Sequence, residues 1–388
     1  MNHCEPKLSR RDLIILPCLS LLTVLVLLVG CEAAARFFFP SSEEDTCIVA
    51  DSNIGFRFRP NCTAHLKVAE GPWVTNQYNE CGYRTHSSCA PPPAGTARIA
   101  VIGASASLGL FVDYDRTFAT RTGVALTQRC HRPVEVQNLG RQVCSPACVF
   151  HRMDEALALK PDVIVFSVSP HDLETMAYQE VVDRYLPIAP TRPSQLDQKK
   201  GANTKRLQKL ATGSRAVIAA EHFLFQDPAT YLKMYLVYGD KADFLRHPFT
   251  DAWQHRFTDF DLILGEMAAK AHATNVPFVL VEIPSLAQIS ILSLHAPPPG
   301  VDAYAFNREL AAISAHHGIE FVDVLDTFRN HPGSNKDFYM VDGHLNADGE
   351  ALISAPLVDK LAESNIPALS SCVAPLETAS LHKAPGSN

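Results

Sequence analysis

Five short apolar runs, each followed by a segment of helical character, constrain the fold of this chain more than any other feature. The runs are rich in Val and Ile and occupy residues 98–103, 134–140, 162–168, 277–283 and 319–324. Helices are expected near 116–129, 147–159, 253–272, 302–316 and 346–362. Continuous β-branched runs that alternate with helices are typical of a parallel sheet covered on both faces. The sequence therefore predicts an α/β fold in three layers, α/β/α, around a mostly parallel five-stranded sheet.

The N-terminus predicts export. Residues 13–31 form an uncharged apolar run behind Lys7, Arg10 and Arg11, about as long as one membrane span. Because a basic flank stays in the cytoplasm, the rest of the chain is expected to face the periplasm or the extracellular side. Two alternatives stay open: a signal peptide cleaved after 33–35 (AAA), and a lipoprotein that is lipidated on Cys31. All three interpretations export the domain.

Cysteine usage agrees with export. An even number of cysteines follows the apolar run, which favours disulfides in an exported domain: Cys47, Cys62, Cys81, Cys89, Cys130, Cys144, Cys148 and Cys372. The close pairs Cys81/Cys89 and Cys144/Cys148 suggest local bridges, but the sequence leaves the connectivity open. No CxxC pair or HxxxH pattern accompanies these cysteines, so no metal site is predicted.

Composition divides the chain into four parts. They are residues 1–36 (cytoplasmic N-terminus and anchor or signal), a Cys/Pro-rich, loop-rich lead-in over 37–97, the α/β domain over 98–364, and a tail over 365–388 that is expected to be disordered. An insertion over 174–250 is expected to be helical, as either an extra layer or a lid. The net charge of −7 and the shortness of basic runs such as 199–209 argue against a nucleic-acid partner.

The stretch 103–109 (GASASLG), at the end of the first strand, is the candidate functional turn. A dinucleotide-binding turn needs a glycine where Ser105 stands, and a Walker loop needs Gly-Lys-Ser/Thr. The lipase-type elbow Gly-x-Ser-x-Gly needs a glycine where Ser107 stands. What remains is a serine at the carboxyl end of a strand, where open α/β sheets bind their ligands. Residues 342–344 (DGH), just before the last helix, offer it a base and a carboxylate to orient that base.

Four short sequence blocks, taken in chain order, resemble the four blocks that define the SGNH (GDSL-type) hydrolase superfamily. Residues 103–109 resemble the first block, Gly-Asp-Ser-x-x-x-Gly, and Gly140 matches the glycine of the second block. Residues 169–172 (SPHD) match the third block, which is usually Gly-x-Asn-Asp, and residues 342–344 match the fourth. Residues 75–84 (TNQYNECGYR) resemble the Thr-Asn-x-x-Gly-Phe-Arg lead-in of membrane-anchored members from bacterial envelopes. The resemblance covers about 70–172 and 275–360, without the insertion. It implies a flavodoxin-like SGNH fold.

The resemblance also implies site residues and a reaction. Ser105 would be the nucleophile, with His344 as base and Asp342 as its orienter. The Ser105 and Gly140 N–H groups and the His171 side chain would bind the oxyanion. The ester is expected to be an acetyl group on a glycan. The acyl-serine intermediate would pass its acyl group to water in an esterase, or to a sugar hydroxyl in an O-acyltransferase. The substrate would be a small-molecule or glycan ester, with no metal or organic cofactor.

Two residues depart from the family pattern. Ala104 stands where the first block has Asp, and His171 stands where the third block has Asn. An imidazole N–H donates more strongly when it is protonated, which predicts either a pH-sensitive oxyanion hole or a decayed one. Losing one oxyanion donor costs about 10²–10³ in rate. A non-catalytic glycan-binding or scaffold protein therefore stays open as an alternative. Asp172 is interpreted as a cap of the helix that follows.

Overall fold

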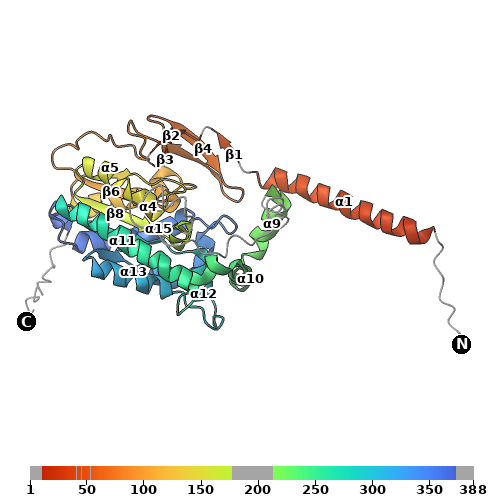
Figure 1. The fold of residues 1–388 in the computed structure, drawn as a ribbon. Helices are drawn as coiled ribbons and strands as arrows, with labels where there is room; N and C mark the ends of the chain where they lie inside the picture. Colours follow the sequence, from red (N-terminus) through yellow and green to blue (C-terminus); the bar gives the residue numbers. More distant parts are fainter. Residues whose placement is uncertain (1–10, 41, 45, 53, 177–212, 373–388) are drawn as a thin grey trace, which may run out of the picture.

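The computed structural model describes residues 11–372 except 41, 45, 53 and 177–212. Its central sheet has five parallel strands in the order β10-β9-β8-β6-β7 (Figure 1). The strands are β6 (Ala97–Gly103), β7 (Val134–Asn138), β8 (Val163–Val168), β9 (Phe278–Glu282) and β10 (Glu320–Val322). Each predicted strand lies at its predicted place. The predicted fold class, a three-layer α/β/α fold with a five-stranded parallel sheet, is confirmed.

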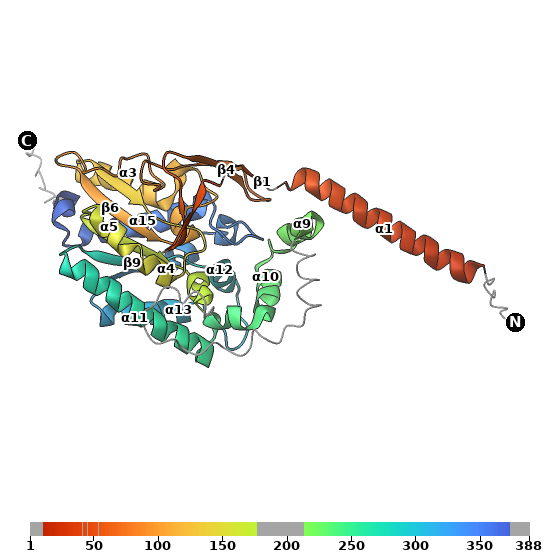
Figure 2. The same ribbon diagram turned by 45° about the horizontal axis from the view of Figure 1, so that its top comes forward.

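Helices cover both faces of this sheet (Figures 1 and 2). One face packs on α3 (Phe118–Cys130), α12 (Leu286–Leu292), α14 (Leu325–Arg329) and α15 (Ala347–Glu363). The other packs on α4 (Pro146–Phe150), α5 (Met153–Ala158), α11 (Asp251–Ala273) and α13 (Ala305–His316). Along β6, Ile99 and Val101 enter the first core, whereas Ala100 and Ile102 enter the second. Burial on both faces explains why the strands are continuously apolar.

The lead-in holds more regular structure than the loops that the sequence predicts. An antiparallel sheet has the order β1-β4-β5, and β2 pairs with β3 beside it. These strands are β1 (Ser42–Glu44), β2 (Ile48–Asp51), β3 (Gly55–Phe58), β4 (Thr63–Lys67) and β5 (Trp73–Gln77). Each is only three to five residues long. Runs this short carry little periodic signal, which is why the sequence did not reveal them.

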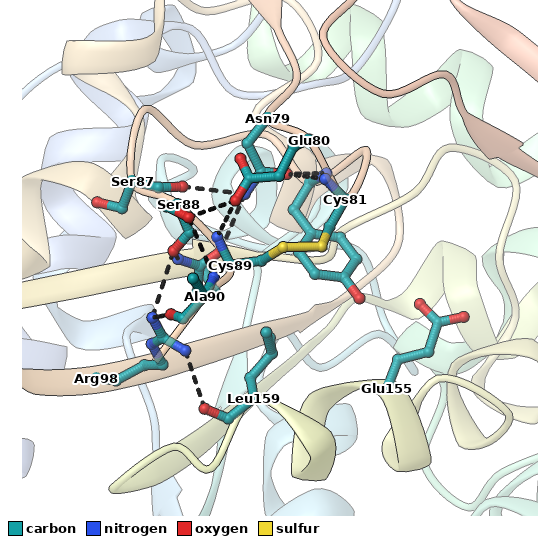
Figure 3. The surroundings of a disulfide bond; sticks show 12 residues. Asn79, Glu80, Cys81, Ser87, Ser88, Cys89, Ala90, Arg98, Glu155 and Leu159 are labelled. Carbon is teal, nitrogen blue, oxygen red and sulfur yellow. Dashed lines mark hydrogen bonds between the residues drawn. A yellow bond between two sulfur atoms is a disulfide. The ribbon is translucent and has the colours of Figure 1, made fainter. Parts of the chain in front are cut away.

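The eight cysteines after the apolar run form four disulfides. The two local bridges suggested by sequence, Cys81–Cys89 and Cys144–Cys148, are present, and the other two are Cys47–Cys62 and Cys130–Cys372. Figure 3 shows the Cys81–Cys89 bridge, beside which the Glu80 carboxylate accepts the N–H of Cys89 at 2.8 Å. Cys18 and Cys31 are free and exposed.

The Cys130–Cys372 bridge corrects the expected start of the disordered tail. It ties the end of α3 to a short helix, η5 (Pro367–Cys372), in which Cys372 is fully buried. Residues 367–372 are therefore part of the fold, although the sequence assigned them to the tail. The rest of the predicted tail, 373–388, lies outside the described residues.

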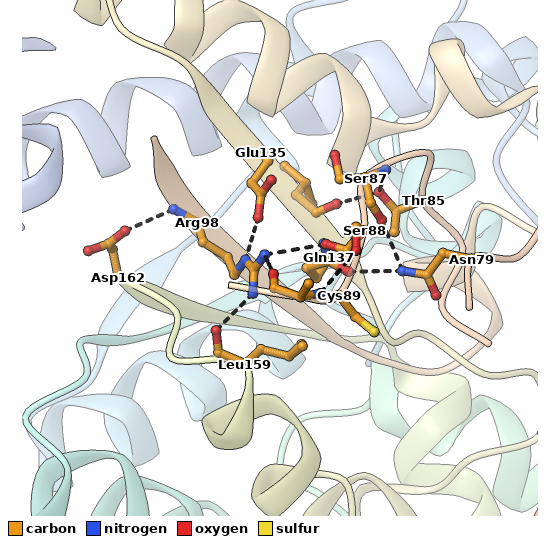
Figure 4. A network of polar contacts seen from close by, with 12 residues as sticks. Asn79, Thr85, Ser87, Ser88, Cys89, Arg98, Glu135, Gln137, Leu159 and Asp162 are labelled. Atoms are coloured by element: carbon orange, nitrogen blue, oxygen red, sulfur yellow. Dashed lines mark hydrogen bonds and ion pairs between the residues drawn. The ribbon is translucent and has the colours of Figure 1, made fainter. Parts of the chain in front are cut away.

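A buried arginine fastens the lead-in to the sheet at the end away from the carboxyl ends of the strands (Figure 4). The guanidinium of Arg98, near the start of β6, donates to the carbonyls of Leu159, Ser88 and Ala90 and pairs with Glu135. Because this network satisfies a fully buried charge, it is expected to be structural. It leaves the carboxyl ends of the strands for chemistry.

Two further parts lie beside the three layers. The helix α1 (Asp12–Phe38) projects from the domain (Figures 1 and 2) and is long and apolar enough to cross a membrane. The described part of the insertion, residues 213–250, forms α9 (Arg215–Leu224), α10 (Pro228–Tyr235) and η3 (Leu236–Leu245). The insertion begins within α6 (Pro170–Thr175), and residues 177–212 of it lie outside the described residues.

Candidate active site

The sheet order places the candidate site at a topological switch point. From β6 the chain first moves to β7 on one side, and β8 then adds on the other side of β6. Open α/β sheets bind ligands in the crevice at the carboxyl ends of two such strands. Ser105 lies two residues after the end of β6, as the first residue of the short helix α2 (Ser105–Leu108), and His171 lies three residues after the end of β8.

Ser105, His344 and Asp342 are brought together in one hydrogen-bonded line. The Ser105 Oγ lies 2.7 Å from His344 Nε2, and His344 Nδ1 lies 2.6 Å from Asp342 Oδ1. A carboxylate can only accept, so Nδ1 carries the proton and Nε2 is left to accept from the serine hydroxyl. The side chains of His344 and Asp342 are 28% and 26% exposed, so the imidazole is accessible from solvent. This is the arrangement of a nucleophile, its base and an orienting carboxylate.

Gly103 is required by the close approach of β6 and β8 just before the serine. Its φ of +148° lies in the region that favours glycine, and a Cβ there would lie 1.9 Å from Ser107 Oγ and 2.6 Å from the Ser167 carbonyl. Ser107 Oγ contacts Ser167 Oγ and also donates to the Ile102 carbonyl at 3.3 Å. These bonds hold α2 against both strands. Ala104, by contrast, is buried and provides no side-chain cap to α2.

Arg84 supports the other end of α2 and was missed by sequence reasoning. Its buried guanidinium donates to the carbonyls of Leu108 and Gly109 at 2.5 and 2.6 Å. Burial lowers the pKa of Arg84 to about 10, so it stays charged at neutral pH. The available signal was its place at the end of the lead-in motif 75–84. The motif includes Arg84, but it does not reveal that this residue binds the end of α2.

Glu70 supports the loop that carries Asp342 and His344, and the sequence holds no signal for this contact. Its side chain is 2% exposed and lies between β4 and β5. One oxygen, Oε1, accepts the backbone N–H groups of Val341 and Asp342 at 2.8 and 3.2 Å. The other, Oε2, lies 2.7 Å from Nδ1 of His222 on α9. Glu70 therefore positions Asp342 through the backbone.

Replacing Glu70 by Ala is expected to lower kcat by about 10–10², because misplacing a catalytic group by about 1 Å costs up to that much. KM for a small ester should change little, since Glu70 does not line the cavity. Glu70→Gln keeps a carbonyl oxygen for the two N–H groups and should recover most of kcat. Steady-state kinetics on p-nitrophenyl acetate would show this split. Equal losses of kcat in both variants, or none in Glu70→Ala, would contradict the assigned role.

A cavity of about 290 Å³ opens at Ser105 and His344. One wall comes from the start of α6, and a second from the segment 283–286 after β9. The described part of the insertion supplies a third wall of apolar and aromatic side chains: Phe225, Tyr231, Met234, Tyr235 and Tyr238. The volume suits a small ligand. The insertion thus contributes directly to the site.

Gly140 does not fit its expected role as an oxyanion donor. Its N–H donates to Oδ1 of Asn138 at 2.9 Å, and it is not among the residues that line the cavity. Its lack of a side chain serves packing instead, because a Cβ there would lie 2.5 Å from the Leu108 nitrogen. Of the two predicted backbone donors, the Ser105 N–H remains, since the first N–H groups of a helix have no acceptor within the helix.

His171 lines the cavity and is held by a carboxylate. Its Nδ1 lies 3.1 Å from Glu174 Oε2, and Lys241 pairs with Oε1 of the same carboxylate at 2.8 Å. The hydrogen bond that His171 donates to Glu174 raises the pKa of His171. Because Nδ1 donates to a carboxylate, the neutral ring has a bare Nε2. Nε2 gains a proton to donate only in the imidazolium form.

Asp172 caps α6, as the sequence predicts. Its Oδ2 accepts the backbone N–H and the hydroxyl of Ser169 at 2.7 and 2.9 Å. Burial raises the pKa of this carboxyl. The capping box fixes the start of α6 and with it the place of His171 beside the cavity.

One group of possible metal ligands lies away from the cavity, within the described residues. Asp261 of α11 and the pair His316 and His317 at the end of α13 bring their ligand atoms within 4.8 Å of one another. Oδ1 of Asp261 is 2.7 Å from His317 Nε2 and 3.3 Å from His316 Nδ1. Hydrogen bonding to two imidazoles is a sufficient account of this carboxylate.

Comparison with known proteins finds similarity only to solved structures. No family model matches the sequence, and no curated protein matches it. TesA is 16% identical, with coverage of 68% of this chain and 97% of TesA and a TM-score of 0.37. A lipolytic protein of the G-D-S-L family from Veillonella parvula is 12% identical, with coverage of 69% and 100% and a TM-score of 0.37.

A mutant of Axe2, an acetyl-xylooligosaccharide esterase from Geobacillus, is 11% identical, with coverage of 70% of this chain and 96% of that one and a TM-score of 0.37. GDSL-type lipolytic hydrolases are thus the structural neighbours, and they are the class that the sequence motifs resemble. At these identities and TM-scores, the fold rests on the observed strand order, and the function rests on the geometry of the site.

Proposed function

We propose that this chain is a serine hydrolase that cleaves or transfers an O-acyl ester outside the cytoplasm. The observation that carries the proposal is the line of two hydrogen bonds from Ser105 through His344 to Asp342, at the mouth of a cavity. A serine that only capped a helix would need neither an imidazole on its Oγ nor a carboxylate behind that imidazole. Export through α1 fits the four disulfides of the domain.

The proposed reaction has two halves that use the same base. In the first, Ser105 Oγ attacks the ester carbonyl carbon while its proton passes to His344 Nε2. The Ser105 N–H and the His171 imidazolium stabilise the oxyanion. The carbon–oxygen bond to the alcohol then breaks, and His344 returns the proton to the leaving oxygen. In the second half, water or a sugar hydroxyl gives its proton to His344 and attacks the acyl carbon. The bond from that carbon to Ser105 Oγ then breaks, and His344 returns the proton to Oγ.

We propose an acetyl group on a glycan as the substrate. The cavity of about 290 Å³ has room for a short acyl group with part of a sugar, but less for a long chain. The acceptor separates an esterase from an O-acyltransferase. Product analysis after incubation of an acetyl ester with and without an oligosaccharide would show which one is used. Acetyl transfer to sugar that exceeds release of acetate would favour the transferase.

Labelling with a fluorophosphonate probe tests whether Ser105 is activated. With the full chain in detergent micelles, one adduct is expected, mapped to Ser105 by peptide mass spectrometry. Heat-denatured protein and His344→Ala should not label, because the serine then lacks its base. A folded wild-type protein that does not label at Ser105 would overturn the catalytic proposal. The non-catalytic glycan-binding domain, which Ala104 and His171 favour, would then replace it.

The charge of His171 should set an alkaline limit to activity. Its pKa is raised, so the imidazolium persists above the usual imidazole value of about 6.5 and is lost as pH rises through the raised pKa. Since only the charged form donates from Nε2, kcat should fall on that alkaline side. A pH profile of p-nitrophenyl acetate hydrolysis, corrected with Ser105→Ala, would measure this limit.

Two variants test the assignment of that limit to His171. His171→Asn supplies an amide donor at every pH, so the alkaline limit should disappear. Glu174→Gln removes the carboxylate that raises the pKa, so the limit should move to lower pH. An alkaline limit that stays in place in both variants would exclude His171 as its source.

A further inference from the structure

We propose that α9 lies in the headgroup layer of the bilayer that α1 crosses, and that the apolar side chains around it form a membrane-facing surface at the rim of the cavity. This inference goes beyond the proposed reaction. It rests on anchoring through α1 and does not depend on catalysis.

The charges of α1 fix where the bilayer ends. The uncharged run 13–31 is about 28 Å long as a helix. This length matches the ~30 Å of bilayer hydrocarbon. Glu32, the next residue, therefore marks the boundary on the side of the folded domain. Its carboxylate pairs with Arg36 one turn later at 2.9 Å, as expected for charges that have just left the apolar layer.

Glu32 also holds the start of α9 at this level. Its carboxylate accepts the hydroxyl of Ser214 at 2.7 Å and the N–H groups of Arg215 and Ala216 at 3.2 and 3.0 Å. A carboxylate at a helix N-terminus satisfies N–H groups that have no acceptor within the helix. Both views show α9 beside the domain-side end of α1 (Figures 1 and 2). The start of α9 therefore lies at the depth at which α1 leaves the apolar layer.

The side chains around α9 suit the interface rather than water. No residue of α9 is buried, and Phe223 and Leu224 at its end are 66% and 57% exposed. The ring of Phe39, just after α1, packs against Phe223 with centroids 6.3 Å apart. Other apolar side chains are exposed at the end of α1 and on α10 and η3: Phe37, Phe38, Met234, Val237 and Tyr238. Apolar and aromatic side chains gathered in this way are typical of interfacial anchors.

The same surface reaches the cavity. Met234 and Tyr238 are both half exposed and line it, and Phe225, the residue after α9, lies in its wall. A second copy of the chain is a less suitable occupant, because it would have to replace the lipid that α1 already brings to this level. The bilayer is therefore the partner to which the surface is assigned.

Depth-dependent fluorescence quenching tests the assignment. Phe223→Trp in the full chain is placed in single-copy nanodiscs of phosphatidylcholine, whose acyl chains are either plain or brominated close to the headgroup. Leu262→Trp on α11, 48% exposed and remote from α9, is the matched control. Signal from the native Trp73 and Trp253 is subtracted with the wild type. Circular dichroism confirms that each variant is folded.

The expected result is loss of emission from Phe223→Trp, but not from Leu262→Trp, when the chains are brominated. Equal emission from Phe223→Trp in both lipids would overturn the proposal, even if the indole spectrum were shifted to the blue, since that shift would indicate contact with protein. Hydrolysis of p-nitrophenyl acetate by the same samples reports on the catalytic proposal separately. Failure of one proposal can thus be told from failure of the other.

Discussion

Ser105→Ala is expected to lower kcat for p-nitrophenyl acetate by about 10⁴–10⁶, the range seen when the nucleophile of a Ser-His-Asp triad is removed. The alanine side chain cannot form the acyl intermediate, so the only remaining route is direct attack by water. The fold should be unchanged, because the one side-chain hydrogen bond found for the Ser105 hydroxyl in the described structure goes to His344. Steady-state rates of the purified full chain would measure the loss.

Ser107 is the matched control, since it lies on the same short helix. Its hydroxyl is buried and bound to Ser167 and to the Ile102 carbonyl, away from His344. Ser107→Ala should therefore cost about 1–3 kcal/mol of stability through unpaired neighbours, and it should lower kcat far less than Ser105→Ala does. A Ser105→Ala protein that keeps wild-type turnover would show that another residue is the nucleophile.

Asp342→Asn is expected to lower kcat by about 10³–10⁴, as the corresponding change does in other triads. The amide has the shape of the carboxylate but can present an N–H to His344 Nδ1. The imidazole then carries its proton on Nε2, where it cannot accept from Ser105. The rate of labelling by a fluorophosphonate should fall with kcat, because both depend on the same base.

Combining the substitutions tests whether the three residues act as a unit. If Asp342 works only through His344 and Ser105, the double variant Ser105→Ala/Asp342→Asn should be no slower than Ser105→Ala. An additive loss in the double variant would show that Asp342 acts on another step. A loss of only a few-fold in Asp342→Asn alone would show that His344 does not need this partner.

The central sheet could be predicted because burial on both faces leaves a strong signal. All five strands and most flanking helices follow from continuous β-branched runs and helical periodicity. The helix expected over 147–159 is divided into α4 and α5 by a turn at His151 and Arg152, which the apolar pattern does not reveal. The lead-in strands were missed because runs of three to five residues carry little periodic signal.

The candidate triad could be located because each member lies in a local motif at a strand end or a helix start. The residues that support the triad could not, since Glu70 and Arg84 act on backbone groups far away in sequence. Gly140 shows a different limit. The motif locates this glycine after the second strand, but only the structure shows that Asn138 Oδ1 accepts the Gly140 N–H. The His171–Glu174 contact, by contrast, was available from its i,i+3 spacing on a helix.

The acyl-serine mechanism is tested most directly by the mass of the protein after rapid acid quench of a reaction with p-nitrophenyl acetate. One acetyl group is expected on the wild-type chain, mapped to Ser105, and none on Ser105→Ala. The acetyl group should vanish as substrate is exhausted. Turnover without an acetyl group on Ser105 at any quench time, or an acetyl group on another residue that disappears at the rate of turnover, would contradict this mechanism.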